Sequence, residues 1–130
     1  MKTKEDIESY LDRLDSGTAE VKEVEPGIWL VRTTADAEVL VQFAPPVVIL
    51  RLTVMTLPAG AKKQAELCRA LLAYNAREMV HGAYGLDGDR VVLVDTLELE
   101  NLDFNEFEAS FDSLTLALAT HLGALAPYRE

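Results

Sequence analysis

The chain has few of the residues on which disulfides, metal sites and membrane anchors depend. Its 130 residues include one cysteine, Cys68, and two histidines, so an intrachain disulfide is excluded and a reducing compartment is expected. No apolar run approaches the roughly 20 residues that span a bilayer. Residues 1–17 have no apolar core of the kind found in secretion signals. We therefore expect a cytoplasmic protein without a membrane partner.

Basic residues are also scarce. Twelve Lys and Arg against 22 Asp and Glu give a net charge of −10, and a surface of this sign repels a phosphate backbone at long range. The nearest approach to a basic patch is the pair Lys62 and Lys63, which is too small to hold a nucleic acid. We expect no nucleic-acid partner, whereas an acidic surface of this kind favours solubility and can attract a basic protein.

Catalytic motifs are missing as well: there is no G-x-S-x-G, no glycine-rich phosphate loop and no H-E-x-x-H. Glu78 and His81 have the Glu-x-x-His spacing of carboxylate-bridged metal sites, but such sites need two of these motifs and two more glutamates. His81 is instead expected at the end of a helix, where a cation suits the helix dipole. Cys68 lies on an apolar stripe, the usual place of an unreactive thiol. We expect no enzyme, no metal and no cofactor.

The segment Asp87-Gly88-Asp89 resembles both a metal-binding loop and a tight turn. A calcium loop of the EF-hand type needs a glycine at its sixth position, which here is Val92, and a helix after it. Strand-forming residues follow Asp89 instead. Because Asp-Gly between two apolar runs is a strong hairpin signal, we predict a hairpin at this point.

The order of helical and strand-like patterns predicts one domain over residues 1–130 with an α+β fold. A Thr3–Asp6 capping box predicts the start of a first helix, which Gly17 is placed to end. The other predicted elements are strands at 28–33, 37–43 and 47–56, a helix at 61–80, strands at 81–86 and 90–100, and a last helix. A second capping box, formed by Asp103 and Glu106, predicts the start of this last helix. Short turns between the strands favour an antiparallel sheet packed with helices.

Two predicted helices have readable apolar faces. The last helix carries a seam that steps by three and four residues: Phe104, Phe107, Phe111, Leu114, Leu118, His121 and Leu125. The helix at 61–80 carries the stripe Ala65, Cys68, Leu71, Leu72, Ala76 and Met79. Asn75 is the polar member of that stripe. We expect its amide to be satisfied by nearby backbone groups, and a ligand role is the alternative. His121 is interpreted as a satisfied core residue, with titration in a core or an interface as the alternative.

The strands are apolar on more than one face. Trp29, Val31, Val92 and Val94 alternate with side chains on the opposite face of their strands. These four residues are our candidates for contact with a second subunit or a client peptide. The alternative is that helices cover both faces of the sheet, and the sequence leaves this choice open.

Several segments together resemble a known family. They are "WLVRT" from Trp29, "LTVMTLP" ending at Pro58, "LCRALLAYN" ending at Asn75, and "AYGLDGDRVVLVDTLELENLDFNEF" from Ala83, followed by a long amphipathic helix. This pattern resembles the YbjN family, whose fold is similar to the type III secretion chaperones of the CesT and Tir-chaperone class. The order α-β-β-β-α-β-β-α matches over essentially the whole chain.

The resemblance implies a non-enzymatic protein, commonly a homodimer, that binds an extended segment of a client or regulatory protein. It brings no catalytic residue with it. A second hypothesis is a sensory-transduction regulator that binds a small ligand in a pocket near Asn75 or His81. A third is an enzyme that uses Glu78 with His81, or Cys68.

Overall fold

The computed structural model describes residues 1–14 and 18–129. In chain order its elements are α1 (Lys4–Arg13), β1 (Thr18–Glu25), β2 (Ile28–Thr33), β3 (Glu38–Ala44), β4 (Val47–Thr56), α2 (Ala61–Arg77), β5 (Ala83–Asp87), β6 (Arg90–Glu98), α3 (Phe104–Leu125) and the short 3₁₀ helix η1 (Ala126–Tyr128). None of the helices in these described ranges has the length and apolarity needed to cross a membrane.

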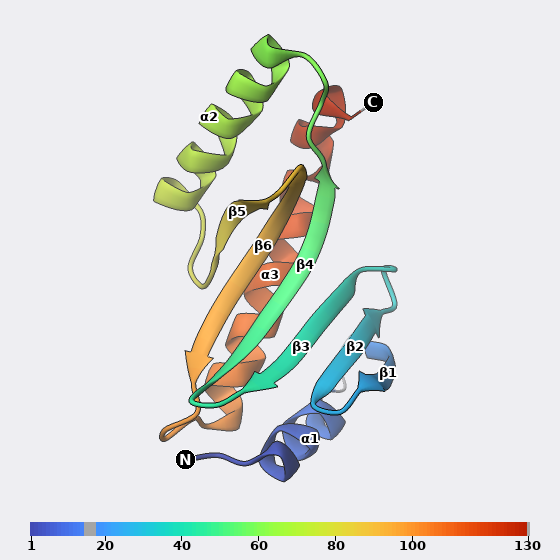
Figure 1. Cartoon of the computed structure of the whole chain (residues 1–130), viewed down its shortest axis with the longest axis vertical. Coiled ribbons are helices and arrows are strands. Elements are labelled where there is room, and N and C mark those ends of the chain that lie inside the picture. Colours follow the sequence, from blue (N-terminus) through green and yellow to red (C-terminus); the bar gives the residue numbers. More distant parts are fainter. Residues whose placement is uncertain (15–17, 130) are drawn as a thin grey trace.

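The strands form one antiparallel sheet, with β4 and β6 side by side near its middle (Figure 1). Among the described residues the sheet has six strands in the order β1-β2-β3-β4-β6-β5. The predicted α+β class and antiparallel pairing are confirmed. The sequence indicated five strands, and the additional one is β1. Its residues include Glu20, Lys22 and Glu23, and this charged edge strand lacks the apolar alternation that marks a half-buried strand.

The two predicted capping boxes are confirmed at the starts of α1 and α3. The Asp6 N–H donates to Thr3 Oγ over 3.3 Å, and the Thr3 N–H donates to the Asp6 carboxylate over 2.8 Å. Asp103 and Glu106 make the corresponding arrangement at α3. These bonds satisfy N–H groups that the first turn of a helix leaves unpaired. The predicted stop at Gly17 lies outside the described residues.

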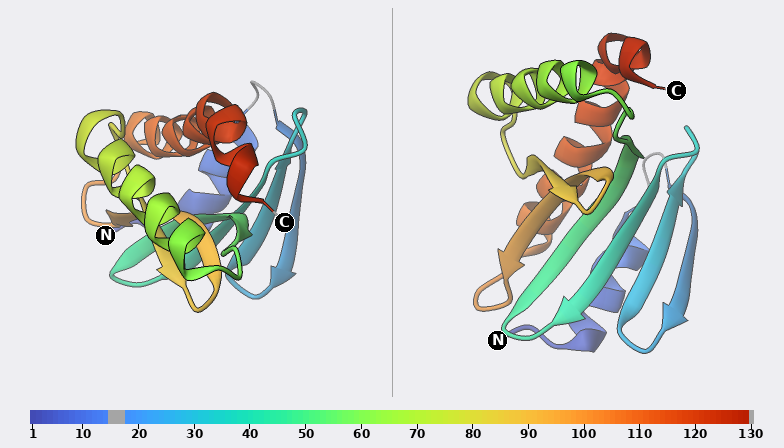
Figure 2. Two further views of the ribbon diagram at one scale, coloured as in Figure 1. Left: turned by 90° about the horizontal axis from the view of Figure 1, so that it is seen from above. Right: turned by 45° about the horizontal axis from the view of Figure 1, so that its top comes forward.

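Helices α1 and α3 lie on the same face of the sheet and enclose the core with it (Figures 1 and 2). The ring of Tyr10 in α1 contacts the rings of Phe104 and Phe107 in α3, with centroids 5.8 and 5.7 Å away. The predicted seam of α3 faces this core. Trp29 and Val31 are buried in the same core, so the expectation that these two residues contact a partner is wrong. The side chains of Ile28, Leu30 and Arg32 in β2 point to the opposite face of the sheet.

The sheet divides into two halves that diverge at one end. Strand β3 pairs with β4 from Leu40 opposite Arg51 to Ala44 opposite Val47, whereas β4 pairs with β6 from Val47 to Thr56. The β2–β3 hairpin therefore leaves β4 beyond Arg51, and Figure 1 shows the two halves separating toward the end where α2 lies. Helix α3 runs behind this divergence.

Helix α2 lies across one end of the sheet, against β5 and η1 (Figure 2). Within α2, which is described in full, the buried residues are Leu67 and Leu71. The predicted apolar stripe is therefore wrong in part, because the side chain of Leu72 is 68% exposed. The helix also ends at Arg77, before the predicted residue 80. A helix that contacts its own chain along a single line buries only a narrow stripe.

The hairpin predicted at Asp87-Gly88-Asp89 is confirmed. Asp87 pairs with Arg90 at the end of β5 and β6, and Gly88 has φ +60°. A positive φ at the first turn position is what a type II′ hairpin turn requires of glycine.

Gly82 supports a test of the packing between α3 and the β5–β6 hairpin. It has φ +78°, and a Cβ at this position would lie 2.8 Å from Leu114 Cδ2 and 2.9 Å from the Val94 carbonyl oxygen. We expect Gly82→Ala to lower the free energy of unfolding by about 2 kcal/mol through strain and overpacking. Urea denaturation followed by circular dichroism measures this change.

The matched control is Gly85→Ala, three residues further on. Nothing lies within 4 Å of a Cβ at Gly85, so this variant should stay within about 1 kcal/mol of the parent, on either side. Equal urea midpoints for the two variants would contradict the close approach at Gly82.

Candidate partner-binding surfaces

Asn75 joins α2 to the outer edge of the sheet. The Tyr84 N–H donates to Asn75 Oδ1 over 2.7 Å, and Asn75 Nδ2 donates to the Tyr84 carbonyl over 3.1 Å. Strand β5 is the last strand of the sheet, so one side of its backbone has no strand neighbour. The Asn75 amide carries the same donor and acceptor as a backbone unit and occupies that edge. The prediction that backbone groups satisfy Asn75 is confirmed.

His121 is buried in a cluster of polar and aromatic side chains at the same junction. Its Nδ1 lies 2.6 Å from Tyr84 Oη, its Nε2 lies 3.4 Å from Glu78 Oε1, and its ring stacks on Tyr74 with centroids 4.0 Å apart. The interpretation of His121 as a satisfied core residue is confirmed. The geometry assigns the tautomer in which Tyr84 donates to Nδ1 and Nε2–H faces Glu78.

Burial, with Tyr74 and Glu78 adding to it, raises the pKa of the Tyr84 hydroxyl far above its ordinary value. Tyr84 therefore remains a neutral donor, and the cluster joins three elements. Tyr84 comes from β5 and His121 from α3, whereas Tyr74 and Glu78 come from the end of α2.

Beside this junction lies an exposed apolar area that we call the α2–β5 patch, defined by Leu72 and Leu86 around a small pocket. Leu72 is 68% exposed and Leu86 52% exposed. The pocket between them measures about 270 Å³ and is also lined by Cys68, Leu71, Asn75, Tyr84 and Gly85. Large exposed leucines grouped in this way mark an interaction surface more often than isolated ones do.

The face of the sheet opposite α1 and α3 forms a second apolar area, which we call the open sheet face. Val92 and Val94 lie on it, opposite Thr53 and Arg51 of β4. In the described part of the chain no helix crosses this face (Figures 1 and 2), so the alternative that helices cover both faces is wrong. Half-buried apolar neighbours extend the face across β2, β3 and β4: Ile28, Leu30, Leu40, Val47 and Ile49.

Val92 itself is buried, whereas Val94 is half-buried and accessible. Of the four predicted partner-binding residues, Val94 is therefore the accessible one. The half-buried apolar residues of β2, β3 and β4 make up the rest of the open sheet face. Leu30 was not among the predicted residues. It lies between the buried candidates Trp29 and Val31 and faces the opposite side of the sheet. The period-2 alternation of β2 identifies its two faces but not which of them the helices cover.

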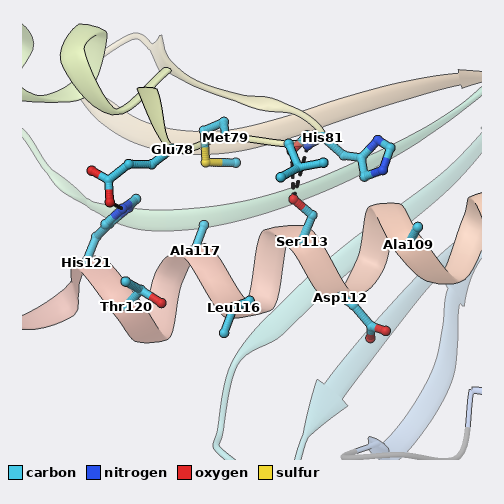
Figure 3. Close-up of a pocket in the computed structure, with 11 residues that line it drawn as sticks. Glu78, Met79, His81, Ala109, Asp112, Ser113, Leu116, Ala117, Thr120 and His121 are labelled. Carbon is cyan, nitrogen blue, oxygen red and sulfur yellow. Dashed lines mark hydrogen bonds and ion pairs between the residues drawn. The ribbon is translucent and has the colours of Figure 1, made fainter. Parts of the chain in front are cut away.

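His81 lies outside α2, because this helix ends at Arg77 with Glu78 as its cap. The expectation that His81 ends the helix is therefore wrong. Its N–H donates to the Ser113 hydroxyl rather than to a helical carbonyl, and the Ser113 hydroxyl in turn donates to the His81 carbonyl. Figure 3 shows the His81 ring pointing away from Ser113, at the rim of a hollow of about 380 Å³.

The Glu-x-x-His pair does not come together as a ligand set. Glu78 pairs with His121, as Figure 3 shows, and within the described residues no three His, Cys, Asp or Glu side chains are grouped to hold a metal ion. The ligand roles of Asn75 and His81 stay predictions: the Asn75 amide is bonded to Tyr84, and the His81 ring is exposed.

Solved structures share this arrangement of sheet and helices. The Yersinia pestis type III secretion chaperone SycH, in complex with a fragment of YscM2, superposes with a TM-score of 0.63 at 17% identity, covering 91% of this chain and 98% of the solved one. A chain of the ExoU–SpcU complex from the type III secretion system of Pseudomonas aeruginosa superposes with a TM-score of 0.62 at 16% identity. The match covers 95% of this chain and 98% of the solved one. A chain of the ExsC–ExsE complex superposes with a TM-score of 0.60 at 16% identity, and the match covers 93% of this chain and 94% of the solved one. The fold is that of type III secretion chaperones.

The family follows from the sequence as a whole. The CesT_Tir_1 family model matches residues 1–130, and the chain belongs to this family of type III secretion chaperones. A search of the curated proteins gives no match. The narrower resemblance to the YbjN family stays a prediction.

The Asn75 bridge gives a test of the α2–β5 junction. Asn75→Ala leaves the Tyr84 N–H and carbonyl without their partners, and we expect the free energy of unfolding to fall by about 2 kcal/mol. Amide hydrogen exchange at Tyr84 should accelerate as well. Urea denaturation and exchange monitored by NMR measure the two effects.

Asn105→Ala is the control, because Asn105 is an exposed residue on α3 and its loss should change stability by no more than about 0.5 kcal/mol. If Asn75→Ala and Asn105→Ala were equally stable, the bridge would contribute nothing to the junction.

Proposed function

We propose that this chain is a cytoplasmic, non-enzymatic chaperone that acts as a homodimer and binds a segment of a partner protein. The observation that carries the proposal is the open sheet face, whose apolar side chains are half-buried and have no helix over them among the described residues. A surface of this kind is stabilised when a partner removes it from water.

The printed descriptions of the three similar structures support a protein as the partner. SycH is in complex with a fragment of YscM2, and the other two structures are the complexes ExoU–SpcU and ExsC–ExsE. The proposal includes no catalytic step. The carboxylate of Glu78 is paired with His121 rather than with His81, which argues against one of the two bases of the enzyme hypothesis, the other being Cys68.

The α2–β5 patch supports the homodimer. Two exposed leucines, Leu72 of α2 and Leu86 of β5, line the same pocket, and the buried residues of α2 are Leu67 and Leu71. A twofold dimer brings the same patch of both subunits together, so each subunit covers the apolar surface of the other.

The dimer is tested by light scattering coupled to gel filtration. The parent chain should elute with twice the chain mass. Leu72→Asp combined with Leu86→Asp should give a folded monomer, because both side chains are exposed in the single chain and burying a carboxylate in a dimer is unfavourable. The matched control, Leu116→Asp on the exposed side of α3, should remain a dimer. A parent chain that stays monomeric at high concentration contradicts this part of the proposal.

Partner binding is tested by purification of the tagged chain from its own cells. A protein that co-purifies in a fixed ratio identifies the client. Leu30→Thr combined with Val94→Thr places a β-branched residue, which suits a strand, at each position in β2 and β6 but makes the open sheet face more polar. We expect this pair to weaken client binding about tenfold, measured by calorimetry with the recovered protein.

Val21→Thr with Val24→Thr makes the same chemical change on the exposed edge strand β1 and should leave binding unchanged. Equal loss with both pairs would argue against the open sheet face as the binding surface. Recovery of a small molecule in place of a protein, in native mass spectra of the same preparations, would favour the ligand-binding alternative at the hollows beside Asn75 and His81.

A further inference from the structure

A third surface lies on the helix side of the sheet beside the split between β3 and β4, where Ala37 and Leu118 also line a cleft with Leu30 and Leu40 of the open sheet face. It is a hollow of about 620 Å³ between α3 and the turn from β2 to β3, bounded by Thr33 to Ala37 on one side and Phe111 to Leu122 on the other. We call it the α3 hollow. It exists because the β2–β3 hairpin separates from β4, so this length of α3 has no strand beside it.

The lining of the α3 hollow is mostly apolar. Leu118 lies half-buried in it, and Ala119 lies on the exposed side of the helix. At its rim the side chain of Leu116 is 67% exposed and that of Leu122 42% exposed. Figure 3 shows Leu116 and Asp112 pointing away from the side of α3 that faces His81 and Met79. The helix thus has a second apolar stripe, on the side away from the β5–β6 half of the sheet.

The electrostatic character of the hollow is negative. Asp112 is its charged lining residue, and partial burial raises the pKa of its carboxyl. No ion pair to Asp112 is formed by the described residues, and the arginines of the nearby strands are paired elsewhere, Arg32 with Glu20 and Arg51 with Asp87. The sequence from Val91 to Tyr128 contains seven Asp and Glu and no Lys or Arg.

We propose that the α3 hollow binds a basic amphipathic helical segment of a partner protein. Apolar side chains of such a helix cover Leu116 and Leu122, while a Lys or Arg on its edge pairs with Asp112. The shape favours a helix, because the hollow runs alongside α3 and a helix laid in a groove presents anchors every three or four residues. A cation beside Asp112 offsets the cost of its partial burial.

This inference goes beyond the proposed function, because it assigns a second surface and a charge to what binds there. The variant positions of the two surfaces do not overlap: Leu30 and Val94 belong to the open sheet face, whereas Asp112, Leu116 and Leu122 line the α3 hollow. A failed test at the hollow therefore leaves the proposed function unaffected, and the converse also holds.

The probe is a fluorescent synthetic peptide of Leu and Lys, roughly 18 residues long so that it forms a helix in isolation. Two comparison peptides have the same leucines with Glu in place of Lys, and the same composition in an order without an apolar face. Fluorescence anisotropy measures affinity for the full chain. Backbone amide shifts in NMR spectra locate the bound peptide.

We expect the Leu/Lys peptide to bind tightest and to shift amides of residues 33–37 and 111–122. Leu116→Ser with Leu122→Ser should weaken binding about tenfold. Asp112→Asn should weaken it about threefold and reduce its dependence on salt. The controls are Val24→Ser, at an exposed apolar residue on β1, and Asp89→Asn, at the exposed turn after β5; both should bind like the parent.

Several results would overturn the proposal. Equal affinity for the peptide without an apolar face means that the net charge alone attracts it. Backbone amide shifts confined to the open sheet face or to α2 would show that the peptide binds there and not in the α3 hollow. Loss of affinity in the Val24→Ser control as large as in the hollow variants shows that exposed apolar side chains bind the peptide without distinction. Tighter binding of the Leu/Glu peptide assigns the opposite charge to the partner.

Discussion

One helix has to cover two half-sheets that point in different directions, and most of the molecule follows from that requirement. Helix α3 runs over β4 and β6 and meets α1, which lies behind the β1–β3 half. Its buried seam of Phe107, Phe111, Leu114 and Leu125 joins a single core with residues from both halves. Because β3 leaves β4 beyond Arg51, the helix cannot be covered along its whole length. The α3 hollow is the uncovered part, so it is a consequence of the fold rather than an addition to it.

The C-terminal half of α3 also determines how α2 is held. The same seam that places leucines in the core places His121 opposite Tyr84 and Glu78. Each such hydrogen bond contributes only about 1 kcal/mol, but leaving one of these buried groups unpaired costs more. Together with the Asn75 bridge, the cluster attaches the end of α2 to β5 while the outer side of the helix stays free. The exposed position of Leu72 depends on this attachment.

Local signals in the sequence predicted the local features correctly. The capping boxes at Thr3 and Asp103, the Asp-Gly turn and the seam of α3 each depend on residues within one or two turns of chain. Features that depend on distant segments were not predictable in this way. Trp29 and Leu30 are neighbours on opposite faces of β2, and only the position of the helices decides which is buried.

The candidate surfaces also depend on contacts between distant segments, which local signals in the sequence do not predict. Asn75 was predicted to bond with backbone groups, because a polar residue on an apolar stripe needs a partner. That the partner is the edge of β5 depends on where α2 crosses the sheet. The contact between Tyr84 and His121 joins residues 37 positions apart, and neither residue carries a local signal for it. The apolar stripe of α2 was misplaced for a related reason, since the elements that this helix contacts, β5 and η1, leave Leu67 buried and Leu72 exposed.

The three surfaces lie on different parts of the molecule, and this has a consequence for binding strength. In the two proposals the open sheet face and the α3 hollow bind two segments of one partner chain at the same time, since the residues proposed for binding do not overlap. When a linker spans the two sites, binding at the first raises the effective concentration of the second segment to roughly the millimolar range. Two individually weak contacts then produce a stable complex, and the proposed dimer through the α2–β5 patch would double the number of sites. An apolar surface of only half-buried side chains is sufficient under these conditions, because no single site has to supply the whole affinity.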